Sequence, residues 1–262
     1  MLNLFVFFLG LCVGSFINVI VDRFDPEEDK GFKKLTSGRS HCDHCKRTLE
    51  VGELVPILSF LIQKGRSRCC STKLGFHYPL VELMMGGLFL LVWYRAMVLY
   101  TFLSTPFLIV VCFWSLFVAL LVALALIDLR TYLLPDKLMM PGIILAFVYV
   151  FSRQAMANSF FGITLFGGLL YLIYLISRGR VMGFGDVKLG VFGGLILGFP
   201  LSGLAFFLSF IFGAIVGIVL LLMGKRGIKD MIPFGPFLVL GILVSFFYGE
   251  WILNWYFGLI RV

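Results

Sequence analysis

Charged residues are scarce in this chain. Only 14% of its 262 residues are charged, whereas 60% are hydrophobic and the mean hydropathy is +1.03. A soluble domain of this length would have to expose mostly apolar surface, so the composition excludes that class. The apolar residues form long unbroken runs and do not alternate with polar ones, as they would in the strands of a membrane barrel. The sequence therefore predicts an all-α polytopic membrane protein.

Basic residues are missing from the start of the chain. Residues 1–21 contain no Lys or Arg, and Asp22 and Arg23 follow them. A cleaved secretory signal would have a basic start and a small-residue cleavage site, so an uncleaved first membrane helix is expected. As one helix, the uncharged stretch Leu189–Gly224 would be about 54 Å long, so a turn at Pro200 must divide it. About eight transmembrane helices are predicted: 1–21, 79–98, 106–127, 138–152, 158–177, 184–199, 202–223 and 234–257.

Lys and Arg are unevenly distributed between the predicted connections. Residues 22–78 form the only sizeable polar segment and contain 11 of the 22 Lys and Arg residues. With the amino terminus outside, the inner connections carry 19 of these residues and the outer ones three. The positive-inside rule therefore places the polar segment, Asp128 and Asp186 on the cytoplasmic side. Loops that face anionic membrane lipid account for the net charge of +8, so no nucleic-acid partner is expected.

Two aspartates lie at the edges of long uncharged stretches. Asp128 ends an apolar run and is followed by Pro135, which stops a regular helix, and Asp186 follows Gly183 and Gly185. An ionisable residue beside hydrocarbon is costly to keep and is a functional hypothesis by default. The glycines leave room for an extended peptide. If the two carboxyl groups converge, they would share a proton and could act as the acid and base of an aspartic protease.

Other interpretations of these aspartates remain open from the residues alone. Each could cap a helix, or Asp128 could pair with Arg130 and Asp186 with Lys188. A Lys188 close to Asp186 could also favour its ionised form and so support catalysis. A proton-coupled transporter would use membrane aspartates as a relay, but its acids would lie near the bilayer midplane between repeated halves. A non-catalytic membrane adaptor would need neither acid.

Four of the six cysteines lie in the polar segment: Cys42, Cys45, Cys69 and Cys70. In a reducing cytoplasm such clusters more often hold a metal than form disulfides, and zinc suits four soft ligands in a closed tetrahedral site. Adjacent cysteines chelate one ion less readily than a pair spaced by two residues. The fourth ligand is therefore open between Cys69 and a histidine (His41, His44 or His77). A reduced, metal-free loop is the alternative.

Six motifs occur in order along nearly the whole chain. They are Gly-Ser-Phe-Ile-Asn-Val (14–19), Cys-x-x-Cys (42–45), His-Tyr-Pro-Leu-Val-Glu (77–82), Ile-Asp-Leu-Arg-Thr-Tyr-Leu-Leu-Pro-Asp (127–136), Met-Gly-Phe-Gly-Asp-Val-Lys-Leu (182–189) and Ile-Pro-Phe-Gly-Pro-Phe (232–237). In this set the sequence resembles the type IV prepilin peptidases. These are membrane aspartyl proteases of the GxGD type, and many are also N-methyltransferases.

The resemblance implies a bacterial inner-membrane enzyme that removes the basic leader of prepilins or pseudopilins at the cytoplasmic face. Its catalytic acids would be Asp128 and Asp186, supported by Gly183, Gly185 and Lys188. Asp136 would be a surface or supporting group. The peptidase domain would cover residues 79–262, after the first helix at 1–21 and the cytoplasmic segment at 22–78.

The resemblance also implies methylation of the new amino terminus with S-adenosylmethionine. The family associates this activity with the first helix and the cysteine segment, where Gly14 and Asn18 match its leading motif. Glu82 matches as well, although an acid at a helix start is an alternative reading. No glycine-rich dinucleotide fingerprint supports a cofactor site independently. The family's second cysteine pair would fall at positions 67 and 70, where this chain has Ser67 beside Cys69-Cys70.

Overall fold

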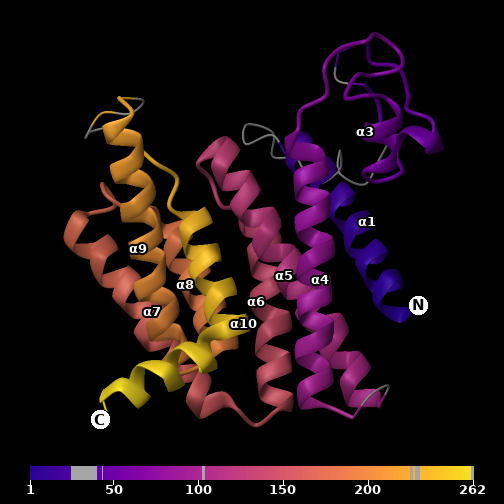
Figure 1. The fold of residues 1–262 in the computed structure, drawn as a ribbon. Coiled ribbons are helices and arrows are strands. Elements are labelled where there is room, and N and C mark those ends of the chain that lie inside the picture. Colours follow the sequence, from indigo (N-terminus) through magenta and orange to yellow (C-terminus); the bar gives the residue numbers. More distant parts are fainter. Residues whose placement is uncertain (25–39, 43, 102–103, 225–226, 228–230, 261–262) are drawn as a thin grey trace. The chain divides into compact units, whose positions relative to one another are not determined.

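A computed structural model describes residues 1–24, 40–42, 44–101, 104–224, 227 and 231–260 (Figure 1). Within these ranges the regular secondary structure is helical, apart from two isolated bridges, His41 to Thr48 and Arg66 to Lys73. The predicted all-α class is confirmed. The basic stretch 25–39 of the predicted cytoplasmic segment lies outside the described residues. The chain forms two compact units, residues 1–119 and residues 120–262.

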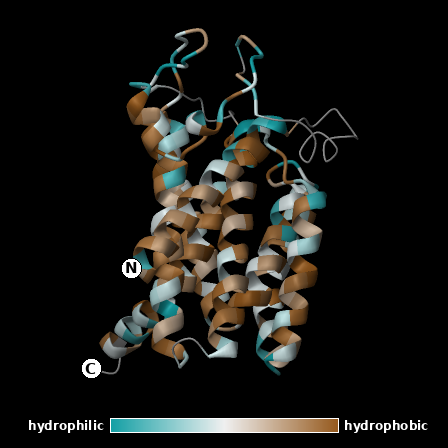
Figure 2. Ribbon diagram, turned by 90° about the vertical axis from the view of Figure 1, so that its right-hand side faces the viewer, coloured by the Kyte–Doolittle hydropathy of each residue, from teal (hydrophilic) through white to brown (hydrophobic). Residues whose placement is uncertain are grey.

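The long helices follow the eight predicted spans in number and order. The elements are α1 (Leu2–Arg23), η1 (Val51–Glu53), α3 (Leu58–Ile62), α4 (His77–Leu99), α5 (Thr105–Thr131), α6 (Asp136–Ser152), α7 (Met156–Ser177), α8 (Phe184–Leu197), α9 (Leu201–Leu222) and α10 (Gly235–Ile260). Hydrophobic residues cover the long helices along most of their length (Figure 2). The chain is a multi-pass membrane protein.

Six of the helices in the described ranges are long and apolar enough to cross a membrane: α1, α4, α5, α7, α9 and α10. The other two predicted spans are shorter helices, since α6 has 17 residues and α8 has 14. A helix of 14 residues is about 21 Å long, less than the roughly 30 Å of a bilayer core. Helix α8 ends at Gly198, whose φ of 64° suits glycine, and α9 begins after Pro200. The break predicted at Pro200 is therefore confirmed.

In the first unit, α1 and α4 pack side by side (Figure 1). Two glycines of α1 face α4 at close range. A Cβ atom on Gly10 would lie 2.7 Å from the carbonyl oxygen of Met85, and one on Gly14 would lie 2.7 Å from the Cα atom of Glu82. Small residues let membrane helices approach in this way. The close approach brings Asn18, one turn after Gly14, beside the amino-terminal turns of α4.

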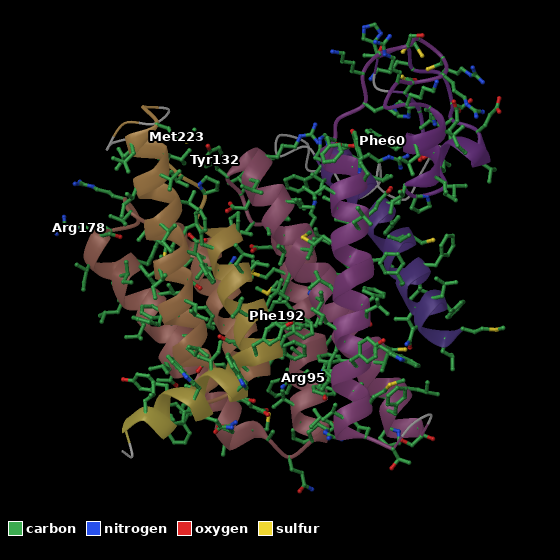
Figure 3. The ribbon with its side chains drawn as sticks, in the orientation of Figure 1. Phe60, Arg95, Tyr132, Arg178, Phe192 and Met223 are labelled. Carbon is green, nitrogen blue, oxygen red and sulfur yellow. The ribbon has the colours of Figure 1, made fainter. Side chains whose placement is uncertain are left out.

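In the second unit, α8 is the central element. It contacts α6, α7, α9 and α10, and Phe192 on α8 is almost fully buried (Figure 3). Its closest neighbour is α7, because glycines on both helices remove the side chains between them. A Cβ atom on Gly194 would lie 2.6 Å from the carbonyl oxygen of Gly162. This packing holds the carboxyl-terminal half of α8, and Asp186 lies in the first turn of the same helix.

Candidate active site and cysteine cluster

Asp128 lies in the last turn of α5 and is 5% exposed. Its Oδ2 atom accepts a hydrogen bond of 2.9 Å from the backbone N–H of Gly235, the first residue of α10. A Cβ atom at position 235 would lie 2.6 Å from the same oxygen. Glycine therefore lets the backbone of α10 hold the carboxylate directly.

Asp186 lies in the first turn of α8 and is partly exposed. Gly183 caps this helix, and its carbonyl oxygen accepts the N–H of Asp186 at 3.2 Å. The charge of Asp128 acts on the Asp186 carboxyl group, so the two acids lie within electrostatic range of each other. The second unit thus brings together two acids that the sequence places in different helices.

The segment between α5 and α6 also contacts the start of α8. A Cβ atom on Gly185 would lie 3.0 Å from that of Leu134, so glycine allows this close approach. The Nζ atom of Lys188 lies 2.6 Å from Oδ1 and 2.7 Å from Oδ2 of Asp136, at the start of α6. Lys188 therefore forms its ion pair with Asp136, which is exposed as predicted for a surface group.

Two carboxyl groups with these positions can divide acid and base work on one substrate. One oxygen of Asp128 is occupied by the Gly235 N–H, which orients the group and leaves its other oxygen for chemistry. General acid–base catalysis requires both groups within reach of the same reacting bond. The arrangement suits hydrolysis of a peptide bond by water, without a serine or cysteine nucleophile.

In the first unit, the sulfur atoms of Cys42, Cys45, Cys69 and Cys70 all lie within 4.8 Å of one another. The Sγ atoms of Cys42 and Cys70 are 3.7 Å apart, and those of Cys69 and Cys70 are 3.8 Å apart. Zinc–sulfur bonds of about 2.3 Å in a tetrahedron give sulfur–sulfur distances of about 3.8 Å. The cluster therefore fits a tetrahedral zinc ion.

Two similar turns carry these cysteines. In the first, the N–H of Cys42 binds the carbonyl of Arg47 and the N–H of Lys46 binds that of Cys42. In the second, the N–H of Ser67 binds the carbonyl of Thr72 and the N–H of Ser71 binds that of Ser67. Lys46 and Ser71 both have positive φ, 58° and 55°.

Ser67 therefore occupies in the second turn the place that Cys42 has in the first. Its Oγ atom lies 3.0 Å from Sγ of Cys69, which reaches the cluster from two residues further on. The sulfur atoms of Cys45 and Cys69 are 3.0 Å apart. Among the described residues the cluster contains the four cysteines, and none of the three candidate histidines belongs to it.

Hydrogen bonds within the first turn favour a thiolate at Cys42. The backbone N–H groups of Cys45 and His44 point to its sulfur and lower the pKa of Cys42 to about 6. The hydroxyl of Thr72 likewise lowers the pKa of Cys70. Thiolates are the form that binds a metal.

The three candidate cofactor residues have different settings. Gly14 is buried against the backbone of α4 and serves helix packing. Asn18 and Glu82 are 6% and 7% exposed, and both line a cavity of about 360 Å³. The cavity also contains Asp22 and Tyr78, which the sequence interpretation did not assign to a site. The phenol of Tyr78 donates to Oδ2 of Asp22 at 2.9 Å.

Sequence reasoning also missed Gly235. It lies in the motif Ile-Pro-Phe-Gly-Pro-Phe, which was noted without a role. The signal for Tyr78 was similar, because it lies in the motif that contains Glu82. Both residues belonged to recognised motifs, and only the fold shows what they contact.

Comparison with known proteins identifies the family. The model of the Bacterial Peptidase A24 N-terminal domain matches residues 8–96, and that of the Type IV leader peptidase family matches residues 115–218. A prepilin leader peptidase/N-methyltransferase of Aeromonas salmonicida is 32% identical over 96% of this chain and 92% of its own length. The chain belongs to the type IV leader peptidase family. The predicted resemblance is confirmed.

Other family members show similar coverage. A prepilin leader peptidase/N-methyltransferase of Bacillus subtilis is 31% identical over 96% of this chain and 96% of its own length. Another of Legionella pneumophila is 30% identical over 95% of this chain and 92% of its own length. No solved structure matches the chain. The second family match begins at residue 115, close to the boundary between the two compact units at residues 119 and 120. Asp128 and Asp186 both lie in this second match.

Proposed function

We propose that this protein is a membrane aspartic endopeptidase that removes the basic leader of type IV prepilins or pseudopilins. The observation that carries the proposal is the approach of Asp128, held by Gly235, to Asp186 in the first turn of α8. Membership of the family supports the same reaction. Residues 79–262 contain all of the proposed peptidase machinery.

The two carboxyl groups would share the work of hydrolysis. The ionised one takes a proton from water as the water oxygen attacks the carbonyl carbon of the scissile bond. The protonated one donates to the carbonyl oxygen, and a proton then reaches the leaving nitrogen as the C–N bond breaks. Gly183 leaves space beside Asp186 for an extended substrate, whereas the space beside Gly185 is taken by Leu134. Lys188 would act as a positioning residue, since its pair with Asp136 joins the starts of α6 and α8.

The positions of the acids within their helices favour cleavage at a membrane surface over proton transport. Asp128 lies in the last turn of α5 and Asp186 in the first turn of α8. A transporter relay would instead need acids near the middle of the spans. The basic connections support a cytoplasmic position for this site in the bacterial inner membrane. A leader peptide and the start of a hydrophobic pilin helix would meet there.

Processing of a co-expressed prepilin tests the peptidase proposal. We expect Asp128→Asn and Asp186→Asn each to abolish leader removal on a gel, because each carboxyl group has its own role. Glu250→Gln is the matched control, since it removes an exposed carboxylate from α10 in the same unit. The proposal is wrong if either aspartate variant still processes the prepilin while both insert into the membrane.

We further propose that the protein methylates the new amino terminus of the mature pilin with S-adenosylmethionine, as the names of its relatives indicate for them. The bound cofactor supplies an electrophilic methyl group. The first helix and the segment 22–78 would carry this activity. Mass spectrometry of the processed pilin tests it, since an unmodified terminus would contradict it.

We also propose that Cys42, Cys45, Cys69 and Cys70 bind zinc, with Cys69 in place of the missing cysteine at position 67. The distances from the sulfur of Cys70 to those of Cys42 and Cys69, 3.7 and 3.8 Å, support this ligand set. We expect Cys69→Ser to lower the zinc content of the purified protein, and the double change Ser67→Cys with Cys69→Ser to restore it. Unchanged zinc in Cys69→Ser would exclude Cys69 as a ligand.

A further inference from the structure

We propose that the cavity of the first unit binds the methyl donor and recognises the positive charge of its sulfonium group. The inference rests on the N-methyltransferase half of the proposed function and assigns it a site. The cavity has a volume of about 360 Å³, within the range of pockets that hold small molecules. Among the described residues it is lined by α1, the cysteine segment and the start of α4.

The floor of the cavity is anionic and already ordered. Glu82 accepts the backbone N–H of Ile57 at 2.7 Å. Asp22 accepts the phenol of Tyr78 at 2.9 Å. Both carboxylates line the cavity and are held by neighbours before any ligand arrives. Such preorganised negative charge suits a cation that carries no hydrogen-bond donor, because the attraction does not depend on a donor.

Asn18 provides a second, independent indication of a ligand. It is 94% buried, and its Nδ2 atom donates to the carbonyl oxygen of Tyr78 at 3.2 Å. Within the described part of the chain no hydrogen bond is made to its Oδ1 atom. Because Asn18 lines the cavity, this oxygen can accept a hydrogen bond from a bound molecule.

Other walls of the cavity match the remaining parts of an adenosyl amino acid. Arg23 and Lys73 line it and can pair with the donor's carboxylate. Phe60 and His77 also line it and offer ring faces for the adenine (Phe60 is labelled in Figure 3). A simple inorganic cation would use the acids alone and leave these cationic and aromatic walls without a role.

The charge of the donor gives the proposal a specific signature. S-adenosylmethionine carries a sulfonium, whereas its product S-adenosylhomocysteine has a neutral thioether at the same place. The anionic floor should therefore favour the charged donor over the neutral product. Removing one carboxylate should weaken binding of the donor about tenfold and reduce this preference, while binding of the product changes less.

The experiment measures equilibrium binding of labelled S-adenosylmethionine and S-adenosylhomocysteine to the purified, zinc-loaded, full-length protein. The variants are Glu82→Gln, which removes one charge, and Ser59→Trp, which fills the cavity and leaves its acids in place. Glu50→Gln is the control, because Glu50 is exposed, pairs with Arg47 at 2.8 Å and does not line the cavity. Zinc content reports whether the first unit of each variant is folded.

We expect Glu82→Gln to lose the preference for the charged donor, Ser59→Trp to lose binding of both ligands, and Glu50→Gln to bind like the unaltered protein. If Glu82→Gln does not fold, Ser59→Trp decides. Normal binding in folded cavity variants, while the unaltered protein methylates a prepilin, would overturn this site and leave the proposed function standing. An unaltered protein that neither binds the donor nor methylates would overturn both.

Discussion

Gly235 donates its backbone N–H to Asp128 and places no side chain in the site. We predict that Gly235→Ala will slow leader cleavage about 10²-fold, because the added methyl group must displace the carboxylate and small displacements of a catalytic group are costly. Gly217→Ala is the matched control, since no atom lies within 4 Å of a Cβ there. Cleavage rates of a purified prepilin compare the two, and equal rates would show that Asp128 does not depend on this contact.

Asp136 and Lys188 form a partly exposed ion pair beside the proposed site. If they position the starts of α6 and α8 as a unit, Asp136→Asn and Lys188→Gln should slow cleavage by the same factor, and the double variant should be no slower than either. We expect a small loss of unfolding free energy, about 0–1 kcal/mol, because exposed pairs stabilise weakly. Multiplying effects in the double variant would mean that Lys188 acts on Asp186 independently of Asp136.

The functional residues that the sequence could reveal are those whose side chains are energetically unfavourable at their positions. Asp128 and Asp186 were evident because a charge beside hydrocarbon needs a reason. Gly235 was not, because its contribution is a backbone N–H, which leaves no trace in the side-chain pattern. The resemblance to the family already placed the missing cysteine at position 67, but the sequence left the fourth member of the cluster open, and only the fold shows that the sulfur of Cys69 lies with the other three.

At the scale of elements, α7 and α8 pack closely where Gly194 meets Gly162. We predict that Gly194→Ala will lower the free energy of unfolding by about 1–3 kcal/mol, because its methyl group meets the backbone of Gly162. Gly168→Ala on α7 is the control, since nothing lies within 4 Å of a Cβ there. Thermal unfolding in detergent measures both. An unchanged melting temperature for Gly194→Ala would show that the two helices can separate at little cost.

Hydropathy predicted the number and order of the long helices. The backbone of each apolar run has no water to bind within the membrane, so it satisfies its hydrogen bonds internally by forming a helix. It did not predict that α8, with 14 residues, would be too short to cross alone. The ends of α8 depend on Gly183 and Gly198, which set the local backbone geometry. Hydropathy also did not predict that α8 packs among four other helices, since apolar residues are found both where a helix faces lipid and where it faces protein.

At the scale of the molecule, the cysteine cluster belongs to the first unit and both aspartates to the second. Cys42 also lines the cavity of the first unit. We therefore predict that removing zinc with a chelator will abolish methylation and donor binding but leave most leader cleavage. Metal analysis with both assays checks this, and Cys112→Ser, which changes a cysteine outside the cluster, should retain its zinc. If chelation abolished leader cleavage together with methylation, the assignment of the two activities to separate units would be contradicted.

The central claim is that Asp128 and Asp186 act together on one peptide bond. The most direct measurement is the cleavage rate of a purified prepilin by Asp128→Asn, Asp186→Asn and the double variant. If the acids work as a unit, each single variant should lose at least about 10²-fold and the double variant should be no slower than the slower single one. If the losses of the single variants multiply in the double variant, or if one single variant cleaves normally, the two acids do not form one catalytic pair.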